Sequence, residues 1–303
     1  MRLSTAYAFA RTQAEITMQQ AQLVRSQDEL STGLKVQKPS DDPFAAAQSE
    51  RARSFQAHLE IDRRSVSFSR STLGSIEGAL GNAGDTLQTV RDRLLSAQSS
   101  VVSMSDRQSI AIELRQMRSE LLGIANRSDG GGGYLFGGQG SEIAPFVDGT
   151  PVQYRAQSGD QLTGVGLPAE IAVNGANAFT SIDSGASKVN LFQVIDSAIT
   201  ALEDPTLSNA NLALNVSPMI SQIDDSLNAN LGMRAKVGER LRALDSHSQY
   251  LDDSELNSKK YNSEMTQVDL AKAISEFNAQ KTNLDAIMKT YSQISKMSLF
   301  DYI

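Results

Sequence analysis

The sequence contains no cysteine and no tryptophan, and only two of its 303 residues are histidine. Without cysteine the chain can form neither disulfides nor thiolate metal sites, and it has no thiol nucleophile. His58 and His247 are far apart in the sequence and fall in predicted helices among polar neighbours, so we expect no zinc site. Aromatic residues make up 6% of the chain and apolar residues 40%, which favours helices packed through aliphatic side chains and alanine.

Long apolar runs and clustered basic residues are also missing. No run approaches the roughly 18–20 apolar residues that a membrane span needs, so we expect no membrane insertion. The first eleven residues lack the apolar stretch of a cleaved signal peptide. The formal net charge is −7 and the charges are scattered, which argues against a nucleic-acid partner because phosphate binding relies on grouped Lys and Arg.

The N-terminal segment has a sparse seven-residue repeat of Phe9, Ile16, Leu23 and Leu30. One apolar residue per heptad is half of a coiled-coil seam, so this helix needs partners to bury its surface. Gly33 is expected to end it.

A second helix is predicted to begin after Ser40, Asp41 and Asp42, whose side chains can cap exposed N–H groups, with Pro43 at the first helical position. It is expected to run to about Val102. At ~1.5 Å per residue it would be roughly 90 Å long, which indicates a rod. Two apolar positions per heptad mark its coiled-coil seam: Leu73, Leu80, Leu87, Leu94 and Val101 on one line, and Ile76, Ala83, Val90, Ala97 and Met104 on the next.

A break and a new cap are expected at Ser105 and Asp106, followed by a helix that ends near Asn126. From Tyr134 to about Ser187 glycine and turn residues recur. Short runs at 151–155 and 170–173 are typical of strands. The glycine-rich stretch 130–140 lacks the Lys-Ser/Thr of a phosphate loop, so we interpret it as a tight chain reversal whose Leu135 and Phe136 form an apolar plug into the domain junction.

Helical periodicity returns at 191–202, and another long helix is expected to begin near Pro218. The last helix carries an apolar stripe and closes with an apolar end. We predict that the stripe and the closing residues form subunit contacts together with Phe9, Ile16, Leu23 and Leu30; they are Leu270, Ile274, Phe277, Leu284, Met288, Tyr291, Ile294, Leu299 and Phe300.

The nested order of these segments predicts a mainly α protein with a small β-rich insert. Residues 1–40 and 262–303 are expected to pair as terminal helices. Residues 41–130 and 189–261 are expected to form an elongated antiparallel helical rod, with the β-rich insert 131–188 at its distal end. Nesting implies that the two chain ends meet in space.

Catalytic chemistry is not indicated by any residue grouping. Asp245, Ser246 and His247 are triad residue types, but adjacent helical positions point in different directions and cannot act as one relay. The pair Asp41–Asp42 is interpreted as a helix cap and hinge with Ser40 and Pro43, and Asp224–Asp225 as a solvated helix face. We therefore predict a protein that is not an enzyme and holds no cofactor or metal.

Several motifs resemble the flagellin superfamily. They are LSTG at 30–33, KPSDDP at 38–43 and LQTVRD at 87–92. YLFGG at 134–138 and SLFDYI at 298–303 are more similar to the superfamily's hook–filament junction members than to filament flagellin.

The resemblance implies an axial structural subunit of the bacterial flagellum. It would leave the cell unfolded through the flagellar type III apparatus and act outside, at the hook–filament junction. The implied partners are further copies of the chain in a ring, hook-associated protein 1, flagellin and a flagellar export chaperone. A filament-forming flagellin is the alternative within the superfamily, and a secreted hydrolase or sugar-binding protein that uses the β insert is the alternative from another class.

Overall fold

The computed structural model describes residues 2–99, 101–138, 143–156, 173–185 and 187–300, and the side chains of 2–6, 8 and 294–300 lie outside this description. The chain forms two compact units. Unit 1 contains Met1–Leu59 and Asp253–Ile303, and unit 2 contains Glu60–Asp252. The predicted mainly α fold with a small β insert is confirmed. The predicted domain boundaries after residues 40 and 261 fall inside unit 1 and stay a prediction.

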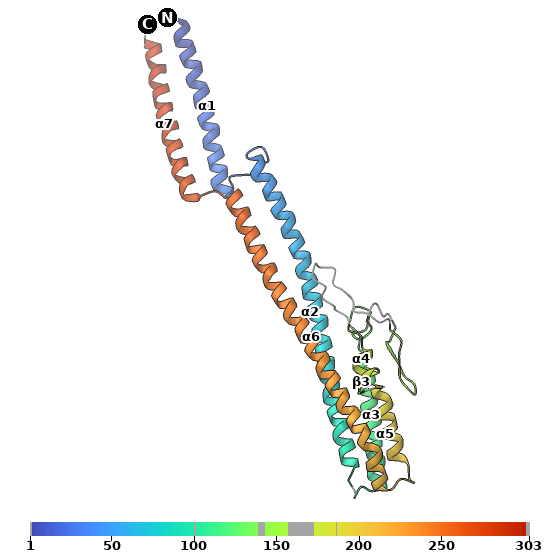
Figure 1. Cartoon of the computed structure of the whole chain (residues 1–303). Helices are drawn as coiled ribbons and strands as arrows, with labels where there is room; N and C mark the ends of the chain where they lie inside the picture. Colours follow the sequence, from blue (N-terminus) through green and yellow to red (C-terminus); the bar gives the residue numbers. More distant parts are fainter. Residues whose placement is uncertain (1, 100, 139–142, 157–172, 186, 301–303) are drawn as a thin grey trace. The chain divides into compact units, whose positions relative to one another are not determined.

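Unit 1 is built on two terminal helices, α1 (Arg2–Thr32) and α7 (Leu270–Phe300), which run side by side in opposite directions with their outer ends together (Figure 1). The expectation that the chain ends meet is therefore confirmed. Helix α1 stops where predicted, because Gly33 has a φ of 70°, a left-handed conformation that glycine adopts without strain. The first turns of α2 (Pro43–Ala97) and the last turns of α6 (Asn209–Thr266) complete the unit.

In unit 2, helices α2 and α6 lie antiparallel along a coiled-coil seam (Figure 1). On α2 the alternating spacing of three and four residues keeps one stripe facing the partner. All eight of its seam residues from 73 to 97 are at most 1% exposed: Leu73, Ile76, Leu80, Ala83, Leu87, Val90, Leu94 and Ala97. These eight predicted seam positions are confirmed, whereas the last two, Val101 and Met104, lie beyond the end of the helix; Val101 is exposed and Met104 half-buried.

Two helix boundaries differ from the sequence expectation. Helix α2 ends at Ala97, about five residues early, and Val101 is 87% exposed in the turn that follows. The new helix α3 (Met104–Ala125) starts at a capping box in which Ser103 and Asp106 exchange side-chain and backbone hydrogen bonds. This cap supplies partners for free N–H groups and so fixes the break at Ser103.

Pro218 does not start a helix, as we had expected. It is the tenth residue of the continuous helix α6. Proline lacks the N–H that would bond to the carbonyl of Leu214, and both residues are exposed. Water can hydrate that carbonyl, while Val216 and Ile220 on the other side of the helix stay buried and hold it in place.

Helix α5 (Leu191–Glu203) packs against α3 and supplies the densest apolar face of unit 2. Asn190 caps it, since its side-chain oxygen accepts from the N–H groups of Phe192 and Gln193. The side chains of Leu191, Phe192, Ile195, Ala198 and Leu202 are fully buried. The helical part of unit 2 thus contains α2, α3, α5 and α6.

The insert is small and irregular. Strand β1 (Phe146–Val147) pairs antiparallel with β2 (Gln153–Tyr154), with Phe146 opposite Tyr154. A short helix, α4 (Ala176–Phe179), leads into the hairpin of β3 (Ile182–Ser184) and β4 (Ser187–Val189). The strand predicted at 151–155 is confirmed in part by β2, and the one at 170–173 lies mainly outside the described residues.

The insert is held by an aromatic cluster that consists of Phe136, Phe146, Phe179 and Phe192. Phe146 and Phe179 meet edge to face with their ring centroids 5.4 Å apart, and Phe136 and Phe179 meet similarly at 5.3 Å. Leu135 and Phe136 are at most 2% exposed, which confirms the predicted apolar plug after the glycine-rich turn.

Candidate assembly interface

The seam between α1 and α7 is half apolar and half polar. On α1 half-buried positions recur every three or four residues, at Thr12, Ile16, Gln19, Leu23, Ser26 and Leu30, and Phe9 continues the row at 37% exposure. Two side-chain contacts show that this row faces α7. The ring of Phe9 lies 4.8 Å from that of Tyr291, and the Ser26 hydroxyl donates to Gln280 Oε1 at 2.9 Å.

The predicted stripe of α7 divides into two faces. Phe277, Leu284 and Tyr291 are buried or half-buried in the row that faces α1. Leu270, Ile274 and Met288 are instead 54%, 49% and 48% exposed, because they lie on the flank of the helix. The predicted contact residues Ile294, Leu299 and Phe300 have side chains outside the described set.

Helix α1 has an apolar outer face that the heptad analysis missed. Tyr7 is 72% exposed and Met18 55% exposed, and their separation of eleven positions amounts to about three helical turns, so they share one line. Val24 is also exposed, at 56%. Val24, six residues after Met18, lies about 120° around the helix from that line, so no regular apolar periodicity in the sequence marked these three positions. Together with Leu270, Ile274 and Met288, these side chains make up what we call the outer apolar surface.

The connectors at the inner end of the terminal pair bind each other. Leu34 forms an isolated antiparallel bridge with Gln267, Lys35 N–H donates to the carbonyl of Thr266 at 2.8 Å, and Val268 N–H donates to that of Gly33 at 3.0 Å. These backbone bonds tie the exit from α1 to the entry into α7. They fix the start of the pair without using any side chain.

The acidic pair of the KPSDDP motif organises the turn before α2. Asp42 Oδ1 accepts from Phe44 N–H and Ala45 N–H, each at 3.0 Å, as an N-cap does. Asp41 accepts from Lys38 N–H and Gln37 N–H, and these bonds, with the charges of Arg25 and Lys38 nearby, lower the pKa of its carboxyl group. Ser40 and Pro43 are exposed at this turn.

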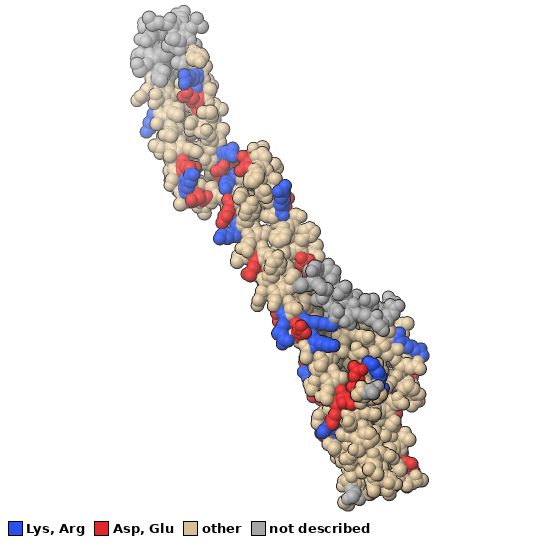
Figure 2. All heavy atoms as spheres, in the orientation of Figure 1, with Lys and Arg blue, Asp and Glu red and all other residues tan. Residues whose placement is uncertain are grey.

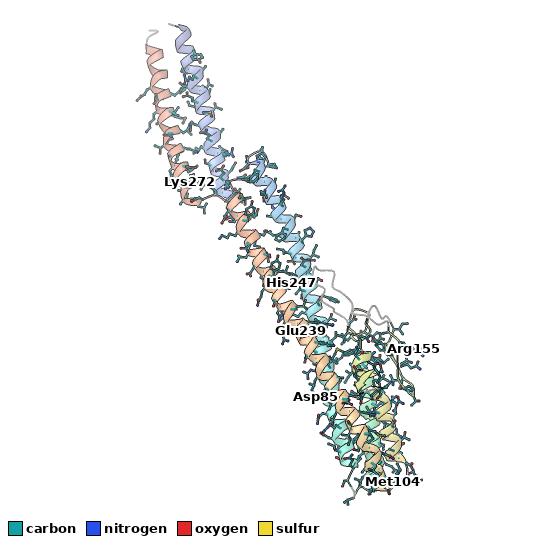
Figure 3. The ribbon with its side chains drawn as sticks, in the orientation of Figure 1. Asp85, Met104, Arg155, Glu239, His247 and Lys272 are labelled. Atoms are coloured by element: carbon teal, nitrogen blue, oxygen red, sulfur yellow. The ribbon has the colours of Figure 1, made fainter. Side chains whose placement is uncertain are left out.

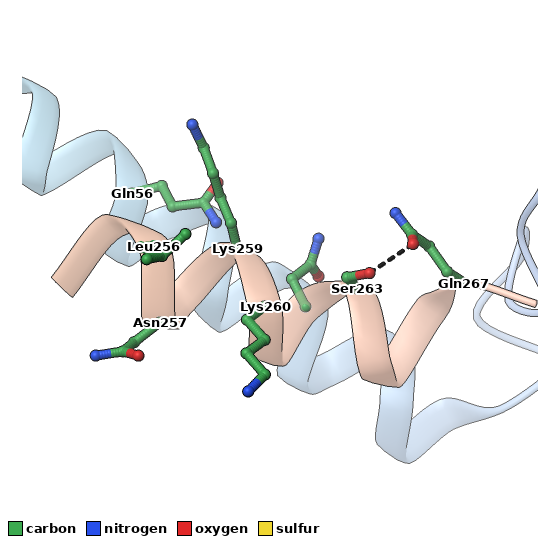
Figure 4. A pocket seen from close by; sticks show the side chains of 8 residues that line it. Gln56, Leu256, Asn257, Lys259, Lys260, Ser263 and Gln267 are labelled. Atoms are coloured by element: carbon green, nitrogen blue, oxygen red, sulfur yellow. Dashed lines mark hydrogen bonds between the residues drawn. The ribbon is translucent and has the colours of Figure 1, made fainter. Parts of the chain in front are cut away.

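A shallow groove in unit 1 lies along the last turns of α6 beside Gln56 of α2 (Figure 4). Its lining includes Lys259, Lys260 and Asn262, and Ser263 hydrogen-bonds to Gln267 at its end. The lining holds no carboxylate, histidine or cysteine. Its Ser263 hydroxyl donates to an amide oxygen, not to a base that could activate it, and Lys259 is paired with Glu255, so the groove shows no catalytic arrangement.

An ion-pair ladder crosses the seam of α2 and α6 in unit 2. Its α2 members, Arg63, Arg70, Glu77 and Arg91, are spaced by multiples of seven residues. Each reaches an opposite charge on α6: Arg63 pairs with Asp252, Arg70 with Asp245 at 3.1 Å, Glu77 with Arg234 at 2.6 Å and Arg91 with Asp224 at 2.5 Å. Neighbouring charges of both signs are visible on the face shown in Figure 2.

The interpretation of Asp224 and Asp225 as a solvated face was wrong. Both are half-buried, Asp224 pairs with Arg91, and Asp225 accepts from the hydroxyl of Ser184 at 2.6 Å, which ties the β3–β4 hairpin to α6. The sequence signal for the ladder was the seven-residue spacing of charges beside the apolar lines. Position 84, the one gap in that spacing, is a glycine, and a Cβ there would lie 3.3 Å from Asn230 Oδ1.

The insert is fastened to the helices by polar side chains at their ends. The amide of Asn126 both donates to and accepts from the backbone of Phe146, at 2.8 and 2.9 Å, as a neighbouring strand would. Arg118 lies between Asp148 and Asp196 and over the ring of Phe192. Burial alone would lower the pKa of Arg118, but hydrogen bonds and charges from the two carboxylates outweigh it and raise that pKa, so the cation is held firmly.

The described part of the chain contains no grouping of side chains arranged for catalysis. His58 is exposed, as expected, but His247 (labelled in Figure 3) is half-buried and stacks on Tyr250 with centroids 6.0 Å apart. Asp245 pairs with Arg70 instead of orienting this histidine. The described residues contain no group of three or more His, Asp or Glu placed to hold a metal ion. Among their helices, none has both the length and the hydropathy required to cross a membrane.

Comparison with known proteins gives one consistent result. The bacterial flagellin N-terminal helical region matches residues 3–141. Flagellar hook-associated protein 3 of Salmonella typhimurium is 31% identical over 313 aligned residues that cover 99% of both chains. Flagellin of Bacillus subtilis is 26% identical, with 91% of this chain and 90% of that protein covered.

A solved structure supports the fold. The crystal structure of the flagellar junction protein FlgL from Legionella pneumophila aligns with a TM-score of 0.62, covering 73% of this chain and all of that chain. The aligned residues are 17% identical, so this likeness speaks for the fold alone.

Proposed function

Because the chain belongs to the family of flagellar hook-associated protein 3, we propose that it is a structural subunit of the bacterial flagellum that joins the hook to the filament. The observation that carries the proposal is 31% identity along nearly the whole length of both proteins. The flagellin match is more distant, at 26%. Two helical ends that pair along a partly polar seam suit a subunit whose ends are completed by neighbours.

The partners proposed on this basis are flagellar. Copies of the chain would form a ring between hook-associated protein 1 and the first flagellin subunits, outside the cell. An export chaperone would hold a terminal segment before passage through the type III apparatus. The partly polar seam of the terminal helices supports this. Segments with few apolar seam residues can remain unpaired until they are delivered to an assembly site.

We assign the subunit contacts of unit 1 to the outer apolar surface. The seam residues Phe9, Ile16, Leu23, Phe277 and Leu284 are used within the pair. Apolar area is left exposed on Tyr7, Met18, Val24, Leu270, Ile274 and Met288. Burying this area against a neighbouring subunit would stabilise the assembly by about 25 cal/mol per Å². In subunits related by a screw operation, this surface contacts a different face of the next copy. Each added copy then leaves its own surface free for another, so the assembly can extend.

Deletion of the gene tests the function. Cells that lack the protein should carry hooks without filaments and should release flagellin monomers into the medium. Normal filaments in the deletion strain would contradict the junction role. The flagellin alternative is separated by abundance, since a filament subunit dominates purified filaments while a junction subunit is present only as a few copies per filament.

A further inference from the structure

Asn174 and Gly175 form the only Asn-Gly pair in the sequence. We propose that Asn174 is a spontaneous modification site: it deamidates when the insert is unfolded and is closed to this reaction when the insert is folded. Asn-Gly is the dipeptide at which the reaction is chemically easiest, because glycine has no side chain to hinder approach of its own nitrogen. No enzyme or cofactor is needed.

The reaction consumes water and releases ammonia. The backbone nitrogen of Gly175 loses its proton and attacks Cγ of Asn174. A new N–Cγ bond forms, the Cγ–Nδ2 bond breaks, and Nδ2 leaves as ammonia with the displaced proton. Water then opens the five-membered imide at either carbonyl, which gives aspartate or isoaspartate at position 174.

The fold retains glycine at position 175 for a packing reason. A Cβ on this residue would lie 2.7 Å from Cβ of Phe136 and 2.9 Å from Cζ of Phe146, both in the aromatic cluster. Such distances are far inside van der Waals contact. Asn174 is used as well, since its Oδ1 accepts from Ala176 N–H at 3.0 Å at the start of α4. The packing of Gly175 and the hydrogen bond accepted by Asn174 therefore give both residues of the reactive pair a structural role.

The same contacts block the reaction in the folded insert. The N–H of Gly175 donates to the carbonyl of Phe136 at 3.2 Å, so the proton that must leave is engaged in a hydrogen bond. Gly175 is buried, and Asn174 forms a bridge with Gly137. Moving the nitrogen onto Cγ requires the breaking of these bonds and a shift of Gly175 against Phe136 and Phe146.

Modification in the unfolded state has a lasting effect. Isoaspartate places one extra methylene in the main chain between position 174 and Gly175. The aromatic cluster leaves no room for that displacement, so the modified insert cannot restore the Gly137 bridge. Aspartate keeps an oxygen that can accept from Ala176 N–H as Asn174 does. The extent of deamidation at Asn174 thus increases with the time that the insert has spent unfolded.

The experiment incubates the full-length protein in parallel in native buffer and in guanidinium chloride at mildly alkaline pH. Peptide mass spectrometry follows deamidation at Asn174, with Asn177 in the same peptide as the internal control. Asn177 precedes alanine and is exposed. We expect Asn174 to react at least about tenfold more slowly in the folded protein, because reaction must wait for local opening of the insert. In the denatured protein Asn174 should react well ahead of Asn177.

A variant provides a second arm without denaturant. Phe179→Ala removes one ring of the aromatic cluster but leaves the Asn-Gly sequence intact, and it should accelerate deamidation of Asn174 in native buffer. Ile112→Ala, on the exposed face of α3, is the matched control and should leave the rate unchanged. Equal rates for folded and denatured wild-type protein would overturn the proposal, as would an unchanged rate in a Phe179→Ala protein whose insert exchanges amide hydrogens faster.

Discussion

Glu77 on α2 accepts two hydrogen bonds from the guanidinium of Arg234 on α6, and this pair has the opposite polarity to the other three rungs of the ladder. A slip of one heptad would place Glu77 beside Asp245 and lose the match. Each rung is partly exposed and contributes little to stability, on the order of 0.2–1 kcal/mol. The value of the sign pattern lies in selecting one register of two long helices.

Charge reversal tests that role. Glu77→Arg should lower the free energy of unfolding by about 0.5–1 kcal/mol because two guanidinium groups then face each other. Adding Arg234→Glu should restore most of the loss. Chemical denaturation of the four proteins in a double-mutant cycle measures the coupling. Lys236→Glu, outside the ladder on the same helix, serves as the control. If it restored the free energy of unfolding of Glu77→Arg as well as Arg234→Glu does, the pairing would be non-specific.

The seam of unit 1 should matter most after assembly. Leu284→Ala removes the least exposed large side chain among the described side chains of α7 and should cost the assembled subunit about 2–4 kcal/mol. Phe277→Ala should act in the same direction. The heat stability of assembled particles measures this cost. Melting of the free subunit should hardly change if neighbours are needed to pair α1 with α7; an equal loss in the free subunit would show that the pair is already formed.

Substitutions in the outer apolar surface should weaken assembly without lowering the stability of the free subunit, in contrast to substitutions in a core. Ile274→Gln changes a side chain that is 49% exposed, so the free subunit should unfold as the wild type does. Assembly should weaken, because a buried amide in a subunit contact lacks a partner. Sedimentation of assembled against free protein measures the effect. Lys272→Gln, two residues away and exposed, is the matched control; indistinguishable assembly of both variants would exclude Ile274 from the contact.

Gly175 should tolerate no side chain. Gly175→Ala introduces a Cβ into the aromatic cluster and should destabilise the insert by about 1–3 kcal/mol through overpacking. Hydrogen exchange localised to residues 143–156 and 173–185 reports the loss. Gly74→Ala is the contrasting variant, since nothing lies within 4 Å of a Cβ there and the residue is inside α2. It should stabilise the protein by about 0.5–1 kcal/mol.

The capping box of α3 should make the free energy of unfolding depend on pH in the acidic range. Hydrogen bonds from the side chain and backbone of Ser103 lower the pKa of Asp106 below its ordinary 3.8. A carboxylate with a lowered pKa stabilises the fold fully above its unfolded pKa, and this contribution disappears as the pH falls through the folded pKa. Asp106→Asn should therefore be less stable than the wild type at neutral pH, with the difference shrinking below pH 3.8. A difference independent of pH would contradict this origin.

Periodicity predicted the helices well because the seam of α2 repeats without interruption from Leu73 to Ala97. The flagellin resemblance was likewise confirmed by the full-length match. Periodicity failed at Pro218 because burial of Val216 and Ile220 outweighs one missing hydrogen bond. It also merged two faces of α7, since Leu270, Ile274 and Met288 lie close enough in angle to Phe277 and Leu284 to look like one stripe.

Contacts between distant segments could not be predicted in the same way. The rungs of the ladder depend on which residue of α6 faces which residue of α2, and this register is absent from either helix alone. The aromatic cluster draws Phe136, Phe146, Phe179 and Phe192 from four separate elements, with no periodic signal to connect them. The capping of α2 by Asp42 was readable because a cap is a local arrangement.

The hydrogen bond between Ser26 and Gln280 joins residues 254 positions apart in the chain. Closing so long a loop directly costs much conformational entropy and is slow. Pairing of α2 with α6, through rungs such as Arg63 and Asp252, shortens the open loop before the ends have to find each other. The terminal helices should therefore be the last part of the chain to order during folding and the first to separate during unfolding.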